Sequence, residues 1–435
     1  MTCNWPELTI DELKSSEKGS IAMGPFGSRI KAENFVKSGV PVLKGGNLHG
    51  AYIDDNECDY LTEEKADELK SSNAFEGDIV ITHRGTIGQV SIIPKGATYN
   101  RYVVSQSQLK VSLDKEKVNP YYVNYFLRSR IGQHRLLSYA SQVGVPAIAK
   151  ASTSVKQIQV PCPPLAVQDE IVSFLQSLDH KLTVNNQINQ SLEEMAQAIF
   201  KSWFVDFDPV KAKMNGAQPE GMDAATASLF PEKLVESELG LIPEGWEVGT
   251  LSDVAKYCSA RTNTDTITLE NYISTENMLA EKKGVTAASK LPTAKTVAAY
   301  KSGDILVSNI RPYFKKIWLA EGSGGRSNDV LGFESVSANS DSYLMNLLYQ
   351  DTFFEYMTRT SKGAKMPRGD KTAIMNWEMA VPPVELRETF SAIVDKFYQL
   401  IPQNRAQNAT LVSLRDTLLP KLLSGEIELA PQGSQ

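Results

Sequence analysis

The chain contains two copies of one sequence pattern. Gly77-Asp78-Ile79-Val80 returns as Gly303-Asp304-Ile305-Leu306, and Pro163-Pro164-Leu165 returns as Pro382-Pro383-Val384. A repeat interval of roughly 220 residues is far too long for a solenoid, so it indicates two copies of a whole domain. The recurring segments begin, in the same order in both copies, at Trp5 and Trp246, Gly77 and Gly303, Tyr122 and Tyr343, and Pro163 and Pro382.

Composition limits the class of protein. A chain of 435 residues with 42% hydrophobic and 22% charged residues is typical of a globular protein of two or three domains. No apolar stretch approaches the ~20 residues of a membrane span, and the first residues lack the pattern of a signal peptide. We therefore expect a cytoplasmic protein without a membrane partner. The four cysteines stand far apart, which predicts reduced thiols without disulfides or zinc.

Short β-type segments separated by Gly, Pro and Asn predict that each copy folds as a mostly-β head. Apolar and aromatic residues at helical spacing predict one short helix over residues 120–130. The clearest strands are expected at residues 79–82, 90–93 and 109–113 in the first head, and at 304–308, 316–320 and 332–337 in the second.

A long helix is predicted after each head. Proline is favoured at a helix start, so Pro163-Pro164 marks the beginning of the first. Apolar residues then alternate steps of four and three from Ile171 to Trp203, and again from Phe390 to Leu422, which is the pattern of a coiled-coil seam. About 40 helical residues span roughly 60 Å. Pro402 lacks a backbone donor and should kink or interrupt the second helix near Ile401.

Both seams carry two asparagines at equivalent positions, Asn185 and Asn189 in the first and Asn404 and Asn408 in the second. A polar Asn in an apolar seam costs stability, but it fixes the register when it pairs across the interface. The sequence therefore predicts an α+β fold. Two similar mostly-β domains are each followed by a long helix, and the helices pack as an antiparallel coiled coil with internal pseudo-twofold symmetry. The alternative is two unrelated amphipathic helices, each packed on its own head.

These patterns give a domain map. The first head covers residues 1–160 and its helix 161–205, and turn-forming residues predict a looped connector over 206–240. The second head covers 241–381 and its helix 382–428, followed by a flexible tail at 429–435.

The distribution of charge is more informative than the net charge of −6. Residues 77–160 hold 11 Lys and Arg against 3 Asp and Glu, so half of the first head is strongly basic. In the second head the basic residues gather locally, around Arg311 and between Arg359 and Lys371. Basic clusters at matching places in both copies favour a polyanionic partner.

The sequence predicts neither a catalytic site nor a metal site. Asn119-Pro120-Tyr121-Tyr122 resembles the loop with which amino-methyltransferases hold a flipped base. The second copy reads Ser340-Asp341-Ser342-Tyr343, however, and no Gly-rich cofactor loop follows a strand, so we expect only a helix start at Pro120. The segment from Gly363 to Thr372 lacks the spacing of a P-loop, which favours a basic loop that faces phosphates.

Six further motifs stand in order along the chain: Gly24-Pro25-Phe26-Gly27-Ser28, residues 160–168 (VPCPPLAVQ), 202–210 (SWFVDFDPV), 221–226 (GMDAAT), 242–248 (IPEGWEV) and 418–427 (LLPKLLSGEI). Together with the duplication, these motifs resemble the specificity subunit of a type I restriction-modification enzyme over essentially the whole chain.

The resemblance implies two target recognition domains, each of which reads one half of a split double-stranded DNA target. It implies that the paired helices set the distance between the halves and dock two methyltransferase subunits, and it leaves open whether restriction subunits join. No cofactor is expected in this chain, because the resemblance assigns S-adenosylmethionine, ATP and Mg to partner subunits. The implied role is host defence against foreign DNA, performed by a non-catalytic subunit.

We predict DNA contacts from basic and amide side chains on turns or beside glycine in the basic regions, because such groups bind phosphates and base edges. Different loop sequences in the two heads predict different half-sites. The candidates are Arg84, Arg101, Gln106, Gln142, Lys150 and Lys156 in the first head, and Arg311, Lys315, Arg326, Asn328, Lys365, Arg368 and Lys371 in the second.

Two other functions stay open on sequence alone. A stand-alone DNA methyltransferase with duplicated binding domains would need a cofactor loop, and none is visible. A protein scaffold or DNA mimic would suit the net negative charge, but the basic stretch at residues 77–160 argues against it.

Overall fold

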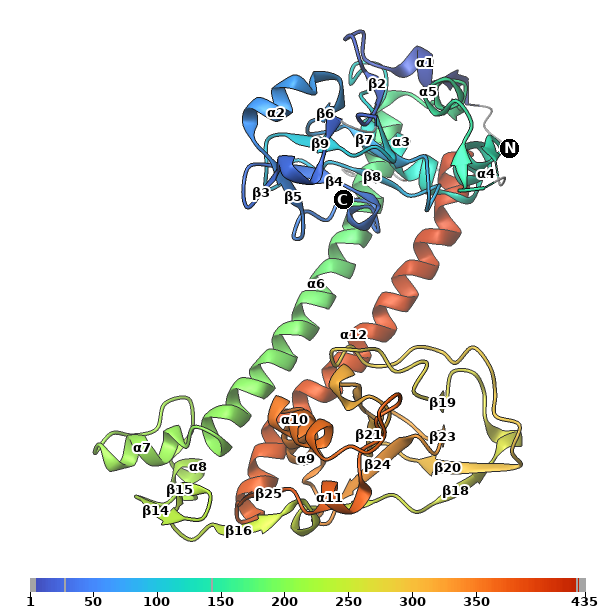
Figure 1. The fold of residues 1–435 in the computed structure, drawn as a ribbon. Helices are drawn as coiled ribbons and strands as arrows, with labels where there is room; N and C mark the ends of the chain where they lie inside the picture. The colour runs from blue at the N-terminus through green and yellow to red at the C-terminus, as the bar shows by residue number, and fades with distance from the viewer. Residues whose placement is uncertain (1–4, 27–28, 142–143, 428, 430–435) are drawn as a thin grey trace. The chain divides into compact units, whose positions relative to one another are not determined.

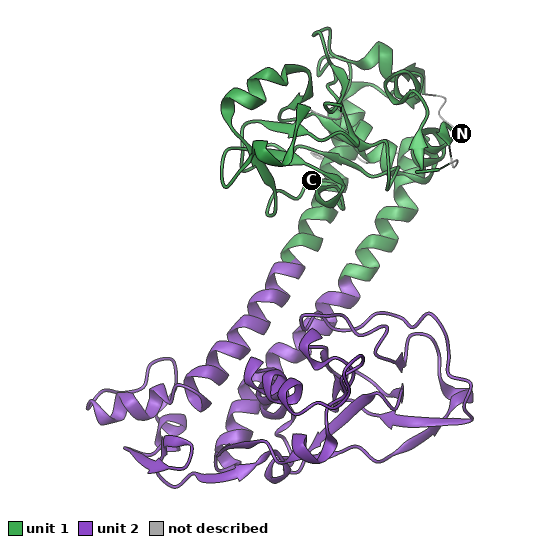
Figure 2. Ribbon diagram, in the orientation of Figure 1, with its two compact units in different colours: residues 1–184, 408–435 green, residues 185–407 purple. Residues whose placement is uncertain are grey.

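The computed structural model describes residues 5–26, 29–141, 144–427 and 429. The chain divides into two compact units (Figure 2). Unit 1 comprises residues 1–184 and 408–435, and unit 2 comprises residues 185–407. The chain has two long helices, α6 (Leu165–Phe204) and α12 (Val384–Leu423), which are labelled in Figure 1. One stretch of each helix belongs to unit 1 and the other to unit 2 (Figure 2).

Unit 1 is built around an antiparallel sheet with the strand order β2–β10–β7–β8, and a second sheet has the order β3–β5–β4–β9–β6. The predicted strands of the first head are confirmed as β7, β8 and β10, whose residues are all buried. The strands are β1 (Glu7–Thr9), β2 (Ile21–Met23), β3 (Phe35–Val36), β4 (Val40–Leu43), β5 (Asp59–Leu61), β6 (Asn73–Ala74), β7 (Ile79–Thr82), β8 (Val90–Ile92), β9 (Tyr102–Val104), β10 (Gln108–Val111), β11 (Ala140–Ser141), β12 (Ala147–Ile148) and β13 (Gln159–Pro161).

Unit 2 repeats this plan. Its central sheet has the order β17–β24–β21–β22. In both units a two-stranded sheet also joins the first strand of the head to its last strand, as β1–β13 in unit 1 and β16–β25 in unit 2. The two similar mostly-β heads predicted from the sequence are thus confirmed. The strands are β16 (Glu247–Thr250), β17 (Ala255–Tyr257), β18 (Arg261–Asn263), β19 (Tyr272–Ile273), β20 (Thr296–Tyr300), β21 (Ile305–Ser308), β22 (Ile317–Leu319), β23 (Gly324–Arg326), β24 (Val330–Ser335) and β25 (Glu378–Val381).

Short helices cover the central sheet of each head. In unit 1, Asn119 caps α3, because its side-chain oxygen accepts a hydrogen bond from the Tyr121 amide at 2.9 Å, and Pro120 occupies the first turn. The Asn-Pro-Tyr-Tyr motif is therefore a helix start, as predicted. The short helices of the heads are α1 (Ile10–Leu13), α2 (Glu63–Glu68), α3 (Pro120–Arg128), α4 (Arg130–Leu137), α5 (Ala151–Lys156), α9 (Asp341–Leu348), α10 (Asp351–Arg359) and α11 (Lys371–Met375).

Within each unit the stretches of α6 and α12 lie antiparallel. In unit 2, Asn189 contacts Asn404, and Phe200, farther along α6, contacts Phe390, which is earlier in α12. In unit 1, Ile171 and Leu175 share a core with Leu419 and Leu422. The predicted antiparallel coiled coil is confirmed by these contacts.

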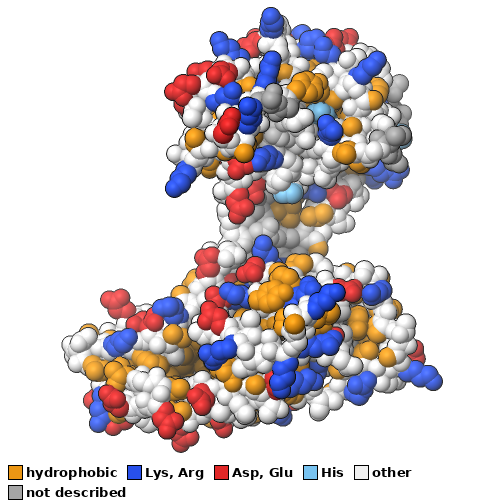
Figure 3. Space-filling model, viewed as in Figure 1, with side chains coloured by type: hydrophobic (Ala, Val, Ile, Leu, Met, Phe, Trp, Pro, Cys, Tyr) orange, Lys and Arg blue, Asp and Glu red, His pale blue; other side chains and the backbone are white. Residues whose placement is uncertain are grey.

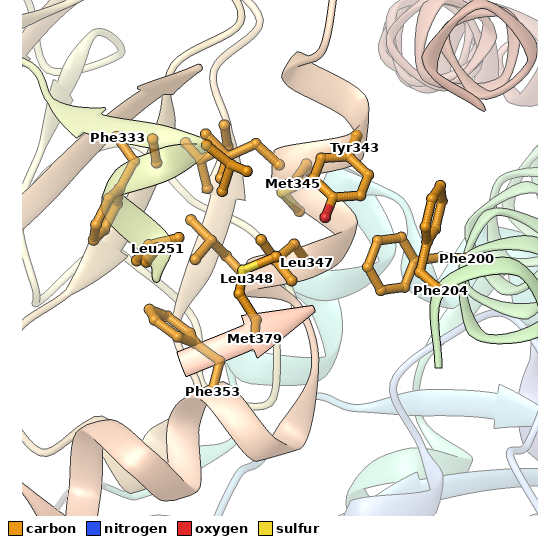
Figure 4. Packing of buried hydrophobic residues seen from close by; sticks show 14 of the residues in the cluster. Phe200, Phe204, Leu251, Phe333, Tyr343, Met345, Leu347, Leu348, Phe353 and Met379 are labelled. Atoms are coloured by element: carbon orange, nitrogen blue, oxygen red, sulfur yellow. The ribbon is translucent and has the colours of Figure 1, made fainter. Parts of the chain in front are cut away.

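The core of unit 2 joins the helices to the head (Figure 4). Phe204 of α6 packs against Tyr343 of α9 and Phe390 of α12, with ring centroids 5.0 Å and 5.3 Å apart. All three rings are buried, and Phe200 lies against the same two partners. Aromatic pairs of this kind dominate core energetics. The head and the helix pair of unit 2 are therefore one packed body.

Polar residues interrupt the apolar seam at its middle. The Asn404 side-chain amide donates to the Asn189 side-chain oxygen at 2.8 Å, and Asn185 donates to Gln407 at 2.7 Å. The four asparagines remain proposed register residues, and Asn408 also has partners. Because buried amides are costly to leave unpaired, this pairing favours one alignment of the two helices.

Two expectations from the sequence need revision. The interruption that we expected at Pro402 does not occur, because α12 runs without a break from Val384 to Leu423. A proline costs a helix one hydrogen bond, and the burial of the neighbouring Ile401 against the seam helps to offset this loss. The connector is not only loops, since it forms α7 (Asp208–Met214), α8 (Ala224–Ser228) and the hairpin of β14 (Leu234–Ser237) and β15 (Gly240–Pro243).

Arg326 is a structural residue of unit 2. It lies in β23, and its side chain is buried, at 7% exposure. Its guanidinium donates to the Val330 carbonyl at 2.5 Å and to the Cys258 carbonyl at 2.9 Å. The side chain thus ties β23, which belongs to a second sheet of the order β18–β20–β23–β19, to the central sheet of the head. Burial lowers the pKa of this guanidinium.

The Asn189–Asn404 pair predicts a strong coupling in a double-mutant cycle. Asn189→Leu alone leaves the Asn404 amide unpaired and should reduce the free energy of unfolding by about 1–3 kcal/mol. The double variant with Asn404→Leu should recover most of this loss, since two leucines pack well in a seam. Urea unfolding followed by circular dichroism gives the values, and equal, additive losses would contradict the pairing.

Replacing Arg326 by Met should destabilise unit 2. The buried Val330 carbonyl and the partly buried Cys258 carbonyl lose this donor, which costs about 2–4 kcal/mol in total. The exposed Lys365→Met in the same unit is the matched control and should leave the unfolding midpoint unchanged. Thermal unfolding of both variants tests this prediction, and an Arg326→Met chain as stable as its parent would show that the bonds contribute nothing.

Candidate nucleic-acid interface

Three loops of unit 1 meet at the carboxyl end of β7. The His83 amide donates to the Ser107 carbonyl at 2.9 Å, the Ile148 amide donates to the His83 carbonyl at 2.8 Å, and the Gly85 amide donates to the Pro146 carbonyl at 2.9 Å. These bonds align the β7–β8 turn, the β9–β10 turn and the segment around β12. We call residues 83–89, 105–107 and 144–150 the first loop cluster.

The same three bonds recur in unit 2 at the carboxyl end of β21. Asn309 donates to the Asp329 carbonyl at 2.8 Å, Gly369 donates to Asn309 at 3.2 Å, and Arg311 donates to Pro367 at 2.8 Å, all from backbone amides to backbone carbonyls. We call residues 309–316, 327–329 and 362–371 the second loop cluster. The shared bonds make His83 equivalent to Asn309, and Ser107 equivalent to Asp329.

The first loop cluster brings three of the predicted residues together. Arg84 and Lys150 are exposed and line one shallow hollow with His83, Val145 and Ile148. Gln106 is also exposed, and its carbonyl lies 3.2 Å from His83 Nε2. Arg84, Gln106 and Lys150 were more than 20 residues apart in the sequence, and the fold places them on one surface.

A glycine permits a close approach behind this surface. A Cβ on Gly24 would lie 1.9 Å from the Ser105 carbonyl oxygen, so only glycine fits there. The Gly24 amide donates to the Gln108 carbonyl at 2.9 Å. The Gly-Pro-Phe-Gly-Ser motif therefore buttresses the turn that carries Gln106, although Gly27 and Ser28 lie outside the described residues.

The second loop cluster contains most of the predicted residues of its head. Lys365, Arg368, Lys371 and Asn328 are exposed, and Arg311 is half-buried. Asn328 precedes Asp329 as Gln106 precedes Ser107, so the two amide side chains occupy equivalent positions. Figure 3 shows Lys and Arg side chains gathered on the visible face of unit 2, with hydrophobic side chains between them.

Carboxylates balance part of this positive charge. Arg368 pairs with Asp329 at 3.1 Å, Lys362 pairs with Asp370, and Lys315 pairs with Asp351 at 3.1 Å. Lys282 and Lys315 hold the pKa of Asp351 below its usual range. A polyanion that bound here would compete with these carboxylates, so its affinity should depend steeply on salt.

Other predicted residues have different surroundings. Arg101 pairs with both Glu63 and Asp67, the latter at 2.6 Å, so its charge is already neutralised. Lys156 is half-buried and pairs with Asp11 at 3.4 Å. The buried Arg326 cannot reach a ligand without breaking its internal bonds, and we correct its expected role to a structural one. Gln142 lies outside the described residues.

Sequence reasoning missed the residues that build the frame. His83 and Asn309 join three loops through backbone groups, and no motif marks them. Aligning the two heads from Gly77 and Gly303 would have matched them by position. In the described part of the chain no group of three His, Cys, Asp or Glu side chains is arranged to hold a metal ion. Nor does any described helix have the length and apolar character to cross a membrane.

Comparison with known proteins gives a consistent result. Residues 22–194 match the family described as the type I restriction modification DNA specificity domain. The MjaIX specificity subunit of Methanocaldococcus jannaschii is 26% identical, over 96% of this chain and 94% of the relative. The HindI specificity subunit of Haemophilus influenzae is 25% identical, over 63% of this chain and 70% of the relative.

A solved structure has the same fold. The S subunit of a type I restriction-modification system from M. genitalium superposes with a TM-score of 0.53 and 16% identity, and 96% of each chain is covered. The sequence match extends over both heads and both helices, and the fold agrees with the duplicated plan described above. Residues 22–194 therefore carry the type I restriction modification DNA specificity domain, and the chain as a whole is similar to type I restriction enzyme specificity subunits.

Proposed function

We propose that the two loop clusters are the surfaces with which this specificity subunit reads the two halves of a split DNA target. The observation that supports this most directly is the repeated frame, in which the same three backbone hydrogen bonds hold three loops at the end of β7 and of β21. Loops fixed on a rigid sheet are the usual carriers of binding residues. Specificity subunits are non-catalytic, so recognition is the function that these surfaces serve.

The side chains on the frame differ between the units. An isolated bridge pairs Arg84 with Ala147 in unit 1 and Ile310 with Arg368 in unit 2, so Arg84 is equivalent to Ile310 and Ala147 to Arg368. The same backbone hydrogen bonds therefore occur in both units, while the side chains at equivalent positions, and the hydrogen-bond donors that they carry, differ. Because base recognition depends on which donors and acceptors reach the major groove, we infer two different half-sites.

Gln106 and Asn328 are the proposed base readers. Both are exposed amides at equivalent positions, and amide side chains form paired hydrogen bonds with N6 and N7 of adenine. Lys150, Lys365 and Lys371 are proposed phosphate contacts, since a lysine acts as a point charge and carries little sequence information. Four more residues stay in the proposed interface, and we do not assign them to bases or to phosphates: Arg84, Arg311, Arg368 and Lys315.

The paired helices serve a second purpose in this proposal. We infer that α6 and α12 set the interval between the half-sites and dock two methyltransferase subunits, which bind S-adenosylmethionine. Restriction subunits would bring ATP and Mg to the same complex. Each helix is continuous over 40 residues, and the polar seam contacts favour a single register. The complex would act in the cytoplasm, where foreign DNA meets the host enzyme.

The proposal predicts an asymmetric split target. Modified-base sequencing of DNA from cells that express this chain with its methyltransferase subunits should show methylated adenine within two unlike half-sites and a fixed gap. Cells with the methyltransferase subunits alone are the control and should show no such motif. A palindromic or continuous motif would contradict the inference from the two unlike surfaces.

Gln106→Ala and Asn328→Ala should each relax one adenine position, and in different half-sites. The loss of a paired hydrogen bond to a base should weaken binding to the target by about 1–3 kcal/mol, with little change for a duplex mutated at that position. Fluorescence anisotropy with target and mutated duplexes measures this. Gln187→Ala, an exposed residue of α6, is the matched control and should bind like the parent chain. An equal loss of affinity for both duplexes would show that the amides contact the DNA backbone and not a base.

A further inference from the structure

One turn of the second loop cluster presents two aromatic rings to solvent. Tyr313 and Phe314 are 47% and 36% exposed, and their ring centroids lie 4.8 Å apart at an interplanar angle of 58°. They belong to the short helix η7 (Pro312–Phe314), in the turn between β21 and β22. Two adjoining exposed rings form a small apolar patch, which is a suitable contact surface for a ligand with flat apolar faces.

The turn is held firmly in this conformation. The Phe314 amide donates to the Arg311 carbonyl at 3.0 Å, within the turn. From outside it, the Glu281 amide donates to the Phe314 carbonyl and the Lys282 amide to the Lys315 carbonyl, both at 2.9 Å. The Arg311–Pro367 bond of the frame fixes the other side. The turn that carries the rings is therefore preorganised before any ligand binds. Preorganisation lowers the entropic cost of an interaction.

The backbone on both sides of the rings is strained. Arg311 and Lys315 have φ of 50° and 49°, in the left-handed region that glycine adopts most easily. In the equivalent turn of unit 1 the two left-handed positions are Gly85 and Gly88. Non-glycine residues in this region tend to cluster at functional sites. Unit 2 has cationic side chains where unit 1 has glycine.

The aromatic pair is also specific to unit 2. Both turns close with the same backbone bond, from Thr82 to Gln89 at 2.9 Å and from Ser308 to Lys316 at 3.1 Å. Between the left-handed positions, unit 1 has Thr86 and Ile87, whereas unit 2 has Pro312 before its two rings. The difference is therefore one of side chains on a shared turn and does not follow from the fold of the head.

Cationic groups surround the rings. Arg311 and Lys315 flank them in the sequence, and Lys316 Nζ lies 5.9 Å from the centroid of the Phe314 ring. Rings between cations match a nucleic acid, which offers apolar base faces between phosphates. An apolar protein surface would not call for these charges.

We propose that Tyr313 and Phe314 form a wedge that enters a base step of the half-site read by unit 2, partly unstacks it and bends the duplex. The inference rests on the proposed DNA-reading function of the second loop cluster. Arg311 and the neighbouring lysines hold the phosphates on either side of the opened step. Sequence preference then arises at that step without base hydrogen bonds, because steps differ in the cost of unstacking.

The experiment uses the complex of the full chain with its methyltransferase subunits, without S-adenosylmethionine. The duplex carries the methylated target and 2-aminopurine, a fluorescent adenine analogue whose emission rises when it loses stacking. The analogue is placed at single positions of each half-site other than the methylated adenine, so that base flipping by the methyltransferase does not contribute. Emission should rise severalfold at adjacent positions of one half-site only.

Tyr313→Ala with Phe314→Ala should abolish this rise and weaken target binding by roughly tenfold, since base stacking on aromatic residues contributes on this scale. Leu at both positions should restore part of the rise, because an apolar wedge does not need a ring. Val336→Ala is the matched control. Val336 is a 46% exposed apolar residue that follows the last residue of β24, whereas residues 327–329 of the second loop cluster lie directly before the first residue of that strand. This variant should behave like the parent chain.

The possible failures are distinct. A complex that does not prefer its target duplex at all would overturn the proposed function itself. Normal binding to the target, without a rise in 2-aminopurine fluorescence at any position, would overturn the wedge but not the proposed function. Normal binding and fluorescence in the double Ala variant, combined with loss of methylation, would assign the rings to a contact with the methyltransferase and also overturn the wedge.

Discussion

The packing of helix residues into the cores of the heads is the interaction on which the rest of this structure depends. Phe200, Phe204 and Phe390 complete the core of unit 2 together with Tyr343 of the head. Ile171 and Leu175 do the same in unit 1, with Leu419 and Leu422 from the other helix. Each unit is therefore closed by stretches of both helices. A change of register would expose large apolar side chains in a head as well as in the seam.

The backbone frame of the loop clusters explains how one fold can serve different targets. Its three bonds join amides to carbonyls and impose no side chain at Gly85, Arg311, Ala147 or Arg368. Side chains on the frame can change while the loops keep their alignment. The cost of such a change is then local, as with the two left-handed positions that hold Gly in unit 1 and Arg and Lys in unit 2.

Much of the fold followed from the sequence, because it depends on local periodicity. Pro163-Pro164 marked the start of α6, and the seam pattern identified both long helices. The site was predicted less well, because it depends on long-range contacts. Nothing local reveals that Arg101 meets Glu63 and Asp67, or that Arg326 folds back onto Cys258. The three loops meet through backbone groups, which no residue pattern marks, and Pro402 shows that tertiary packing can override a strong local preference.

The sharing of cores between distant segments has a consequence for biosynthesis. Leu419 and Leu422 belong to the core of unit 1, yet the ribosome makes them only after the whole of unit 2. During translation part of the apolar surface of the first head therefore stays uncovered until α12 has been made. The second head can complete its core before the first. Nascent chains that stall before α12 is complete would carry an open hydrophobic surface, which is the kind of surface that chaperones bind.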